Sequence, residues 1–408
     1  MTDTRQCAQY SIEEIVFAAI AMFVFKCGSR NNFDNLAKSE NFTTNYRKTF
    51  GHKLPGMDAV ALVLKTISPD ELEKLKSQLV SHLIEKRVFD KWRFEGHLIV
   101  AIDGTGIVSY DHQHCEHCLK KKSKNGKITW FHNVLEAKLV TQNGFSISLC
   151  TEWIENPKGY YDKQDCERRA FERLAQKLKQ TYARLSVCLC ADGLYPNNTF
   201  FALCKQFQWK YIVTLTDKSL KNFWKKIRLI NREAKINIKT EKHTVIKLKH
   251  QWINNTDFNN YTHNWIQLNE TMTSKDKKND KDKHQKFVHL TNIEITQDNA
   301  HLISQTGRLR WNIENQGFDQ QKNHGYNISH QYCRKSYTGL KNFYQCCQIA
   351  HLINQLLQLS KKMEEMISQK ITLTYLWDYL KWSLVFSNID REQINQINNH
   401  RFQVQFIN

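Results

Sequence analysis

Hydrophobic and polar positions follow one kind of spacing before residue 97 and another kind after it. Residues 1–95 carry apolar side chains at helical spacing and show no alternating strand pattern, so we predict a helical N-terminal domain. Ser11 and Glu14 form a capping box ahead of the apolar run 15–25. That run has 11 residues, too few to cross a bilayer, and we interpret it as a buried helix. Further helices are expected over 57–67 and 68–86, and a polar turn over 27–35.

After residue 97, short apolar runs alternate with stretches of helical spacing, which is typical of a mixed sheet with helices packed on its faces. The predicted strands are 97–103, 128–140, 144–154, 186–192, 210–216 and 287–295. The predicted helices are 162–185, 199–207 and, after the last strand, 299–322. Helical patterns over 337–368 and 370–387 are expected to cover the sheet.

Residues 218–286 differ from their surroundings because they are rich in Lys and Asn and contain only short alternating stretches. We predict a β-rich insertion there, with a solvated, charge-dense loop over 274–286. The chain is thus expected to have five parts, namely a helical domain (1–95), the first part of an α/β domain (96–217), the insertion (218–286), a strand and helix that complete the α/β domain (287–335), and C-terminal helices (336–408).

Charge and cysteine content indicate the kind of partner and the cellular compartment to expect. The chain has 59 Lys and Arg against 40 Asp and Glu, a net charge of +19. Clustered basic residues gain affinity for nucleic acid by releasing phosphate counterions, so a polyanionic partner is expected; the alternative is a protein that is merely basic. The N-terminus carries acidic residues where a secretory signal would be positive, so we expect the 12 cysteines to be reduced thiols in a cytosol, with no membrane attachment.

Three acidic residues stand out by their positions. Asp103 and Asp192 each end a predicted buried strand, and ligands of open α/β sheets bind at the carboxyl ends of strands. Either aspartate alone could equally be a turn residue. Glu314 lies four residues after Arg310 on a predicted helix, a spacing that by itself favours a surface ion pair. Together, three acids can hold two Mg²⁺ ions and support phosphoryl transfer on nucleic acid.

The segments that carry these acids resemble a known family. AIDGTG (101–106), CADGLYP (190–196) and GRLRWNIENQGFDQQKNHGY (307–326) are similar to the three acidic blocks of DDE transposases from bacterial insertion sequences. The third block of that group has the pattern Tyr-(2)-Arg-(3)-Glu-(6)-Lys. Here Arg310 and Glu314 fit, Gly307 occupies the tyrosine position, and Lys322 follows Glu314 after seven residues instead of six.

The resemblance implies a ribonuclease-H-like mixed five-stranded sheet flanked by helices. Asp103 would lie on the first strand, Asp192 on the fourth, and Glu314 on a helix beyond the fifth. It also implies that these three acids bind two Mg²⁺ ions, for which Mn²⁺ can substitute. Arg310 and Lys322 would neutralise phosphate oxygens, and the alternative for Arg310 is an ion pair that orients Glu314.

The implied activity is that of a DNA transposase that cleaves strands at the ends of an insertion sequence and transfers them into target DNA. The partner would be double-stranded DNA, bound by a homodimer in the cytoplasm of a bacterium, at the nucleoid. An inactive, DNA-binding derivative and a metal-dependent nuclease without strand transfer remain alternatives. Related transposases use an aromatic residue of the insertion to receive a flipped DNA base. Trp252 and Trp265 are candidates by location, and the alternative is that each belongs to the core.

A separate cluster of metal-ligand residue types lies in DHQHCEHC (111–118). Cys115 and Cys118 form a CxxC pair, and His114 and His117 stand beside them, which makes a structural Zn²⁺ site a candidate. A second pair of ligands is missing from the sequence nearby, and the alternative is a polar loop close to DNA. Three later cysteines, Cys333, Cys346 and Cys347, would contribute only if the fold brought them close.

Overall fold

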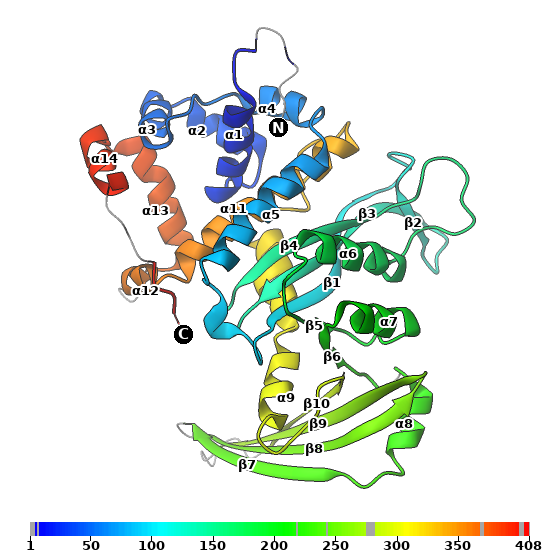
Figure 1. Ribbon diagram of the computed structural model, residues 1–408. Helices are drawn as coiled ribbons and strands as arrows, with labels where there is room; N and C mark the ends of the chain where they lie inside the picture. Colours follow the sequence, from blue (N-terminus) through cyan, green and yellow to red (C-terminus); the bar gives the residue numbers. More distant parts are fainter. Residues whose placement is uncertain are drawn as a thin grey trace.

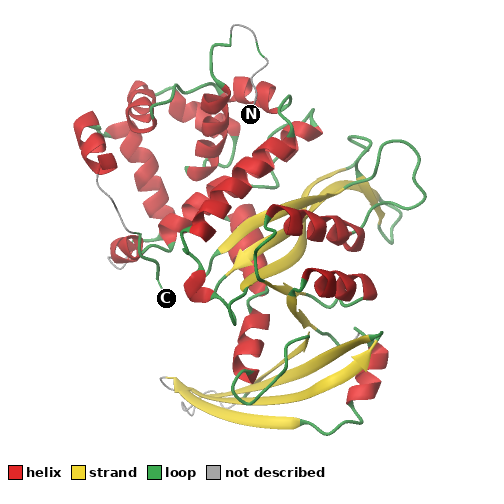
Figure 2. Ribbon diagram, viewed as in Figure 1, coloured by secondary structure: helices red, strands yellow, loops and turns green. Residues whose placement is uncertain are grey.

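The computed structural model describes residues 5, 8–217, 219–241, 244–274, 282–367, 371–399 and 404–407. A group of helices lies at one end of the molecule, a sheet flanked by helices in the middle, and a set of long strands at the other end (Figure 1). Figure 2 separates these helical and strand regions by colour. Most of the charged loop predicted over 274–286 lies outside the described residues.

Ten strands of the described chain form one sheet, in the order β2-β3-β1-β5-β6-β10-β9-β8-β7, with β4 also paired to β3. Their bounds are β1 Leu98–Tyr110, β2 Leu119–Lys122, β3 Ile128–Val140, β4 Ser146–Ile154, β5 Val187–Ala191, β6 Lys210–Thr214, β7 Glu233–Glu241, β8 Thr244–Phe258, β9 Tyr261–Ser274 and β10 Lys283–Thr291. The first five predicted strands appear as β4-β3-β1-β5-β6, antiparallel between β4, β3 and β1 and parallel between β1, β5 and β6. The predicted α/β class with a mixed, ribonuclease-H-like sheet is therefore confirmed.

The sheet is larger than the five strands predicted for it. β10 pairs antiparallel with β6, and β9, β8 and β7 follow β10 as antiparallel neighbours. The β-rich stretch between residues 218 and 286 thus continues the central sheet instead of forming a separate one. α8 (Lys221–Ile227) connects β6 to these long strands, which form the lower end of the molecule in Figure 1.

Helices from both ends of the chain form one group. α1 packs against α4 and α11, and α3 packs against α13, so the N-terminal helices share a hydrophobic core with the C-terminal ones. Asn342 of α11 donates from its Nδ2 to the carbonyl oxygens of Leu64 and Ile67 at the end of α4. The bounds are α1 Ile12–Val24, α2 Arg30–Ala37, α3 Glu40–Phe50, α4 Met57–Leu64, α5 Pro69–Glu85, η1 Asp90–Trp92, α11 Tyr337–Gln358, α12 Lys361–Ile367, α13 Leu373–Phe386 and α14 Arg391–Asn399.

The predicted capping box of the first helix is present, since Ser11 and Glu14 exchange side-chain and backbone hydrogen bonds. The polar turn predicted over 27–35 is wrong, because α2 occupies most of that stretch. Ser29 caps this helix, and Phe33 and Leu36 bury its apolar side. In the part of the chain that the structure describes, no helix combines the length and the apolar character that a membrane span requires.

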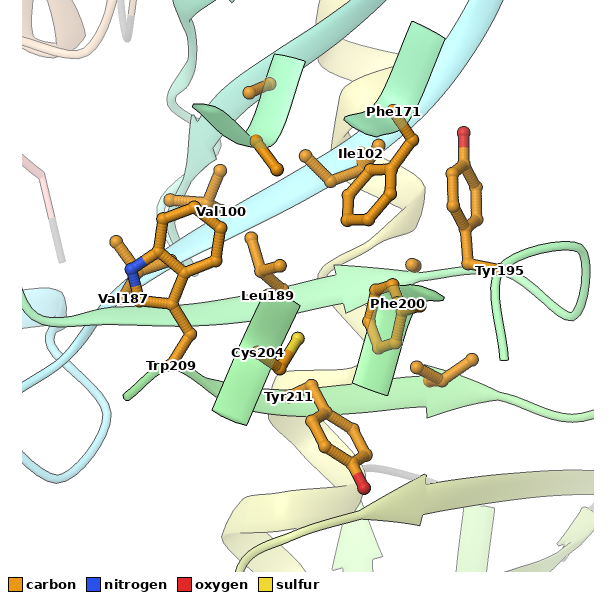
Figure 3. Packing of buried hydrophobic residues seen from close by; sticks show 14 of the residues in the cluster. Val100, Ile102, Phe171, Val187, Leu189, Tyr195, Phe200, Cys204, Trp209 and Tyr211 are labelled. Carbon is orange, nitrogen blue, oxygen red and sulfur yellow. The ribbon is translucent and has the colours of Figure 1, made fainter. Parts of the chain in front are cut away.

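The two faces of the sheet carry different layers. Val100 and Ile102 of β1 pack under α6 (Glu167–Thr181) and α7 (Asn198–Phe207), as Figure 3 shows. Ile99 and Ala101 belong to the core on the opposite face, together with side chains of α9 and η2. Successive side chains of a strand alternate between faces, so Asp103 continues the row of Ile99 and Ala101. The first candidate acid therefore belongs to the face that η2 covers.

Candidate active site

The strand register brings the two aspartates together. β1 and β5 run parallel, and their last paired residues are Ala101 and Cys190. Asp103 lies two residues beyond Ala101, and Asp192 lies two residues beyond Cys190, so both acids stand at the same level of the sheet. β1 does not end at Asp103, as the sequence pattern predicted. It continues to Tyr110, because its other edge stays paired with β3 through a bulge.

Burial and mutual repulsion affect the protonation of these acids. Burial raises the pKa of Asp103 to about 6; Arg310 opposes this shift, while Glu167 and Asp192 add to it. Burial also raises the pKa of Glu167, against a hydrogen bond from the Tyr195 hydroxyl, and the negative charge of Asp192 adds to the rise. Negative charge is thus concentrated in a partly desolvated place, where a cation would be favoured.

Glu167 is an acidic neighbour of the site that the sequence analysis did not single out. It is the first residue of α6, and its carboxylate lies close to the backbone of β1 at Gly104. A Cβ on Gly104 would stand 2.8 Å from Glu167 Oε2, so a larger residue there would displace the carboxylate. The helical pattern of 162–185 marked Glu167 only as a polar helix position. Its place beside Asp103 depends on how α6 packs on the sheet.

The segment that carries Glu314 is attached to β1 on both sides of that residue. Arg310 Nη1 lies 3.4 Å from Asp103 Oδ2, and Lys322 Nζ donates to Thr105 Oγ1 at 2.6 Å. Glu314 lies between these two contacts, with an exposed side chain. η2 (Ile313–Phe318), which contains Glu314, packs against β1 and β4. The two contacts therefore place the segment from Arg310 to Lys322 along the part of β1 that contains Asp103 and Thr105.

The single helix predicted over 299–322 is divided. α9 (Ala300–Arg308) ends in a turn, the π-helix η2 follows, and α10 (Asp319–Asn323) completes the segment. Arg310 is almost fully buried, and the carboxylate it pairs with in the described part of the chain is Asp103. The alternative expectation for Arg310 is an ion pair with Glu314, one turn away. The structure instead pairs it with Asp103. Arg310 also stacks on Trp311, with 4.4 Å from guanidinium to ring centre.

The π-helix explains the extra residue between Glu314 and Lys322. An α-helix turns by about 100° per residue, so seven positions return to within about 20° of the starting face and eight positions leave a difference of about 80°. In η2 the Asp319 N–H bonds to the Glu314 carbonyl oxygen, five residues back. A π turn holds one residue more than an α turn, so eight positions here give nearly the face that seven give elsewhere. Lys322 therefore reaches β1 despite its offset.

Two glycines allow the close packing of this segment. A Cβ on Gly317 would lie 2.8 Å from Ser146 Oγ and 3.4 Å from the Lys138 side chain, so η2 approaches the sheet closely there. A Cβ on Gly307 would lie 2.6 Å from the His289 ring. Any side chain at position 307 would therefore push α9 away from β10. This contact gives a physical reason for glycine at the position where the related pattern has tyrosine.

The insertion tryptophans do not face solvent. Trp252 of β8 and Trp265 of β9 are both fully buried. Trp252 packs in the core below α9, and Trp265 packs in the core that contains Trp224 of α8, with its ring against Arg232. Neither ring can receive a DNA base in this arrangement, which corrects the expectation that one of them does so. Both tryptophans are instead core residues, as the alternative interpretation held.

The cysteine pair meets a histidine that the sequence analysis did not consider. Cys115, Cys118 and His132 of β3 bring their ligand atoms within 4.8 Å of one another. His114 instead stacks on Tyr110, and His117 Nδ1 lies 2.8 Å from the Asn156 carbonyl oxygen. Cys333, Cys346 and Cys347 do not join this group and are buried among the helices.

The acids fit divalent cations by their chemistry. Mg²⁺ takes oxygen ligands, and Asp103, Asp192 and Glu314 offer carboxylates from two neighbouring strands and the helix above them. Among the described residues, these three do not form a group as close as the cysteine group. Arg310 and Lys322 bring positive charge to the same edge.

Cation binding is expected to weaken as the pH falls through 6. The raised pKa of Asp103 means that protons compete for its carboxylate below about pH 6. Millimolar Mg²⁺ should therefore raise the midpoint of thermal unfolding at pH 7.5 and raise it much less at pH 5, where about nine in ten Asp103 side chains are protonated without metal. Differential scanning fluorimetry measures this. Asp103→Asn should remove the Mg²⁺ effect, and an equal shift at both pH values would contradict the expectation.

A comparison with protein families matches the region that contains these acids. A family model described as a transposase DDE domain matches residues 95–338, more than half of the chain. The matched region begins just before β1, contains Asp103, Asp192 and Glu314, and ends at the start of α11. A comparison with curated proteins found no match.

Proposed function

The chain belongs to the DDE transposase family, and we propose that it cleaves DNA strands at the ends of an insertion sequence and joins the freed 3′ ends to target DNA. Proteins of this family bind DNA, transfer nucleotidyl groups and use divalent metal ions such as Mg²⁺. The observation that carries the proposal is the pair of contacts from Arg310 and Lys322 to β1. From these contacts we infer that Glu314 lies within reach of ions held by Asp103 and Asp192, which completes the order Asp, Asp, Glu.

We assign Asp103, Asp192 and Glu314 as the ligands of two Mg²⁺ ions. Bound there, the ions would supply a metal-activated water or 3′-hydroxyl and would stabilise the charge on the leaving oxygen. The protein's own contribution is position. β1 and β5 set the two aspartates at one level through their hydrogen-bonded register, and η2 would present the glutamate to them. Positioning and charge neutralisation supply most of the barrier reduction in phosphoryl transfer.

Arg310 and Lys322 have different tasks in this proposal. Arg310 is buried and paired with Asp103, so it orients this carboxylate and limits the rise of its pKa. Lys322 is bound only by the neutral hydroxyl of Thr105 among its described contacts, so its charge is available to a phosphate oxygen. A lysine hydrogen-bonded to a neutral acceptor gives up little when a phosphate replaces it. Lys322 is therefore the better candidate for contacting the scissile strand.

The proposal includes the setting in which the enzyme works. Two DNA ends brought into one complex require two active sites, so we propose a homodimer assembled on double-stranded DNA. The net charge of +19 supports binding to the phosphate backbone. We place this activity at the nucleoid in the cytoplasm of a bacterium, where the element and its target DNA are found.

The proposal is tested with a supercoiled plasmid that carries the inverted repeats flanking the gene. With purified protein and Mg²⁺, cleavage at the repeat ends followed by joined products is the expected result. Cleavage without joining would support a metal-dependent nuclease instead. Binding to the repeats without cleavage would support a derivative that only recognises DNA. A matched plasmid with scrambled repeats distinguishes end-specific cleavage from general nuclease activity.

A further inference from the structure

Two thiols and one imidazole converge at the base of the β2–β3 hairpin. Cys115 Sγ lies 3.7 Å from Cys118 Sγ, and each sulfur lies 3.4 Å from His132 Nε2. Cys118 and His132 are fully buried, and Cys115 is partly buried. The two cysteines close the loop between β1 and β2, whereas His132 comes from β3. Nothing in the proposed DNA chemistry uses these three side chains.

The distances match those of ligands around one zinc ion. With Zn–S of about 2.3 Å and Zn–N of about 2.0–2.1 Å at tetrahedral angles, two sulfurs stand about 3.8 Å apart and sulfur and nitrogen about 3.6 Å apart. The observed 3.7 Å and 3.4 Å lie close to both values. A disulfide would require the sulfurs to be about 2.05 Å apart, so these cysteines are not disulfide-bonded.

Hydrogen bonds alone do not account for all three contacts. A hydrogen bond along each side of the triangle would need its own proton. Nε2 of His132 is either a donor or an acceptor, and each thiol has a single proton, so at most two of the three contacts can be hydrogen bonds. A metal ion in the centre satisfies all three at once. His132 Nδ1 is also buried without a hydrogen-bond partner among the described residues.

We propose that Cys115, Cys118 and His132 bind a structural Zn²⁺ ion that fixes the β2–β3 hairpin to the catalytic sheet. The two thiolates and the neutral imidazole supply three ligands of a tetrahedral site. This site is separate from the carboxylates that we assign to Mg²⁺. It also replaces the ligand set suggested by the sequence, because His132 takes the place of His114 and His117.

The site lies where a fixed hairpin is useful. The hairpin from Leu119 to Thr129 carries exposed lysines at 120, 121, 122, 124 and 127. Its strands are joined by only four paired positions and a tight turn at Gly126. A metal at its base would hold these charges in one orientation, which suits contact with a DNA backbone. On the other side, His132 stacks on Tyr337 at the start of α11, with 4.2 Å between ring centres.

The test is the metal content of the full-length protein purified under reducing conditions without chelator. Mass spectrometry of the metal should find about one zinc per chain, and Cys118→Ser and His132→Ala should each lower it to below about 0.1. Cys166→Ser removes an exposed cysteine outside the group and should keep the zinc. Asp192→Asn should also keep it, because the ion does not belong to the carboxylates.

Cobalt substitution keeps the proposal testable if the variants fold poorly. Wild-type protein loaded with Co²⁺ should show thiolate-to-cobalt charge transfer and the strong visible absorption of a tetrahedral site. Wild-type protein that takes up no stoichiometric zinc after anaerobic reconstitution would overturn the proposal. Zinc retained by folded Cys118→Ser protein, or lost from Asp192→Asn, would overturn it as well.

Discussion

Replacing Asp192 by asparagine is expected to lower DNA strand cleavage by about a thousandfold or more while leaving DNA binding nearly unchanged. The carboxylate is needed to hold metal, and the loss of a metal clamp removes several kcal/mol of transition-state stabilisation, with a factor of ten in rate for each 1.36 kcal/mol. The turn itself should survive. Asp192 Oδ1 accepts the Leu194 N–H at 2.8 Å, and the amide oxygen of asparagine can accept the same bond.

Cleavage of a plasmid carrying the element ends measures the rate, and gel-shift titration measures binding. Glu172→Gln is the matched control, since it removes an exposed carboxylate on α6 that is not one of the three assigned acids and should leave cleavage unchanged. Asp192→Asn removes a negative charge close to the DNA, so any change in its DNA binding should be a slight strengthening. Cleavage within about tenfold of the wild-type rate in Asp192→Asn would show that this residue is not a metal ligand.

Periodicity alone predicted most of the central sheet. Residues 128–140 form a strand with the predicted bounds. The strand predicted over 186–192 is one residue shorter at each end, and the helix predicted over 199–207 begins one residue earlier. Apolar runs bounded by polar turns are local signals, so they can be recognised without the fold. The strand at Asp103 is longer than predicted. Its second half contains Gly104 and Gly106, which break the apolar pattern, and is held by pairing with β3.

The parts of the site that could not be predicted depend on contacts distant in sequence. Glu167 reaches β1 because α6 packs on the sheet, and His132 meets the cysteine pair because β2 pairs with β3. The π turn that directs Lys322 toward β1 could not be predicted either, since no local propensity distinguishes it from an α turn. In these cases the residue type was visible in the sequence, but its partner was not.

Replacing Gly317 by alanine should disturb η2, the helix that carries Glu314, more than a single added methyl group usually does. The new Cβ would lie 2.8 Å from Ser146 Oγ and 3.4 Å from Lys138 Cδ, inside a packed interface between η2 and the sheet. Overpacking of this kind costs about 1–3 kcal/mol, which exceeds the gain of about 1 kcal/mol that alanine brings to a helix. A shift of η2 by about 1 Å would misplace Glu314 and lower cleavage by about 100-fold.

Ser146→Ala offers a direct test of this cause, because the hydroxyl of Ser146 is buried without a hydrogen-bond partner among the described residues. Its removal alone should change stability and cleavage little. Combined with Gly317→Ala, it removes the nearest clash and should restore most of the activity, with a coupling of about 1–2 kcal/mol in chemical denaturation. A double variant as impaired as Gly317→Ala would show that the glycine serves some other purpose. Full activity in Gly317→Ala alone would mean that η2 does not need its close approach to place Glu314.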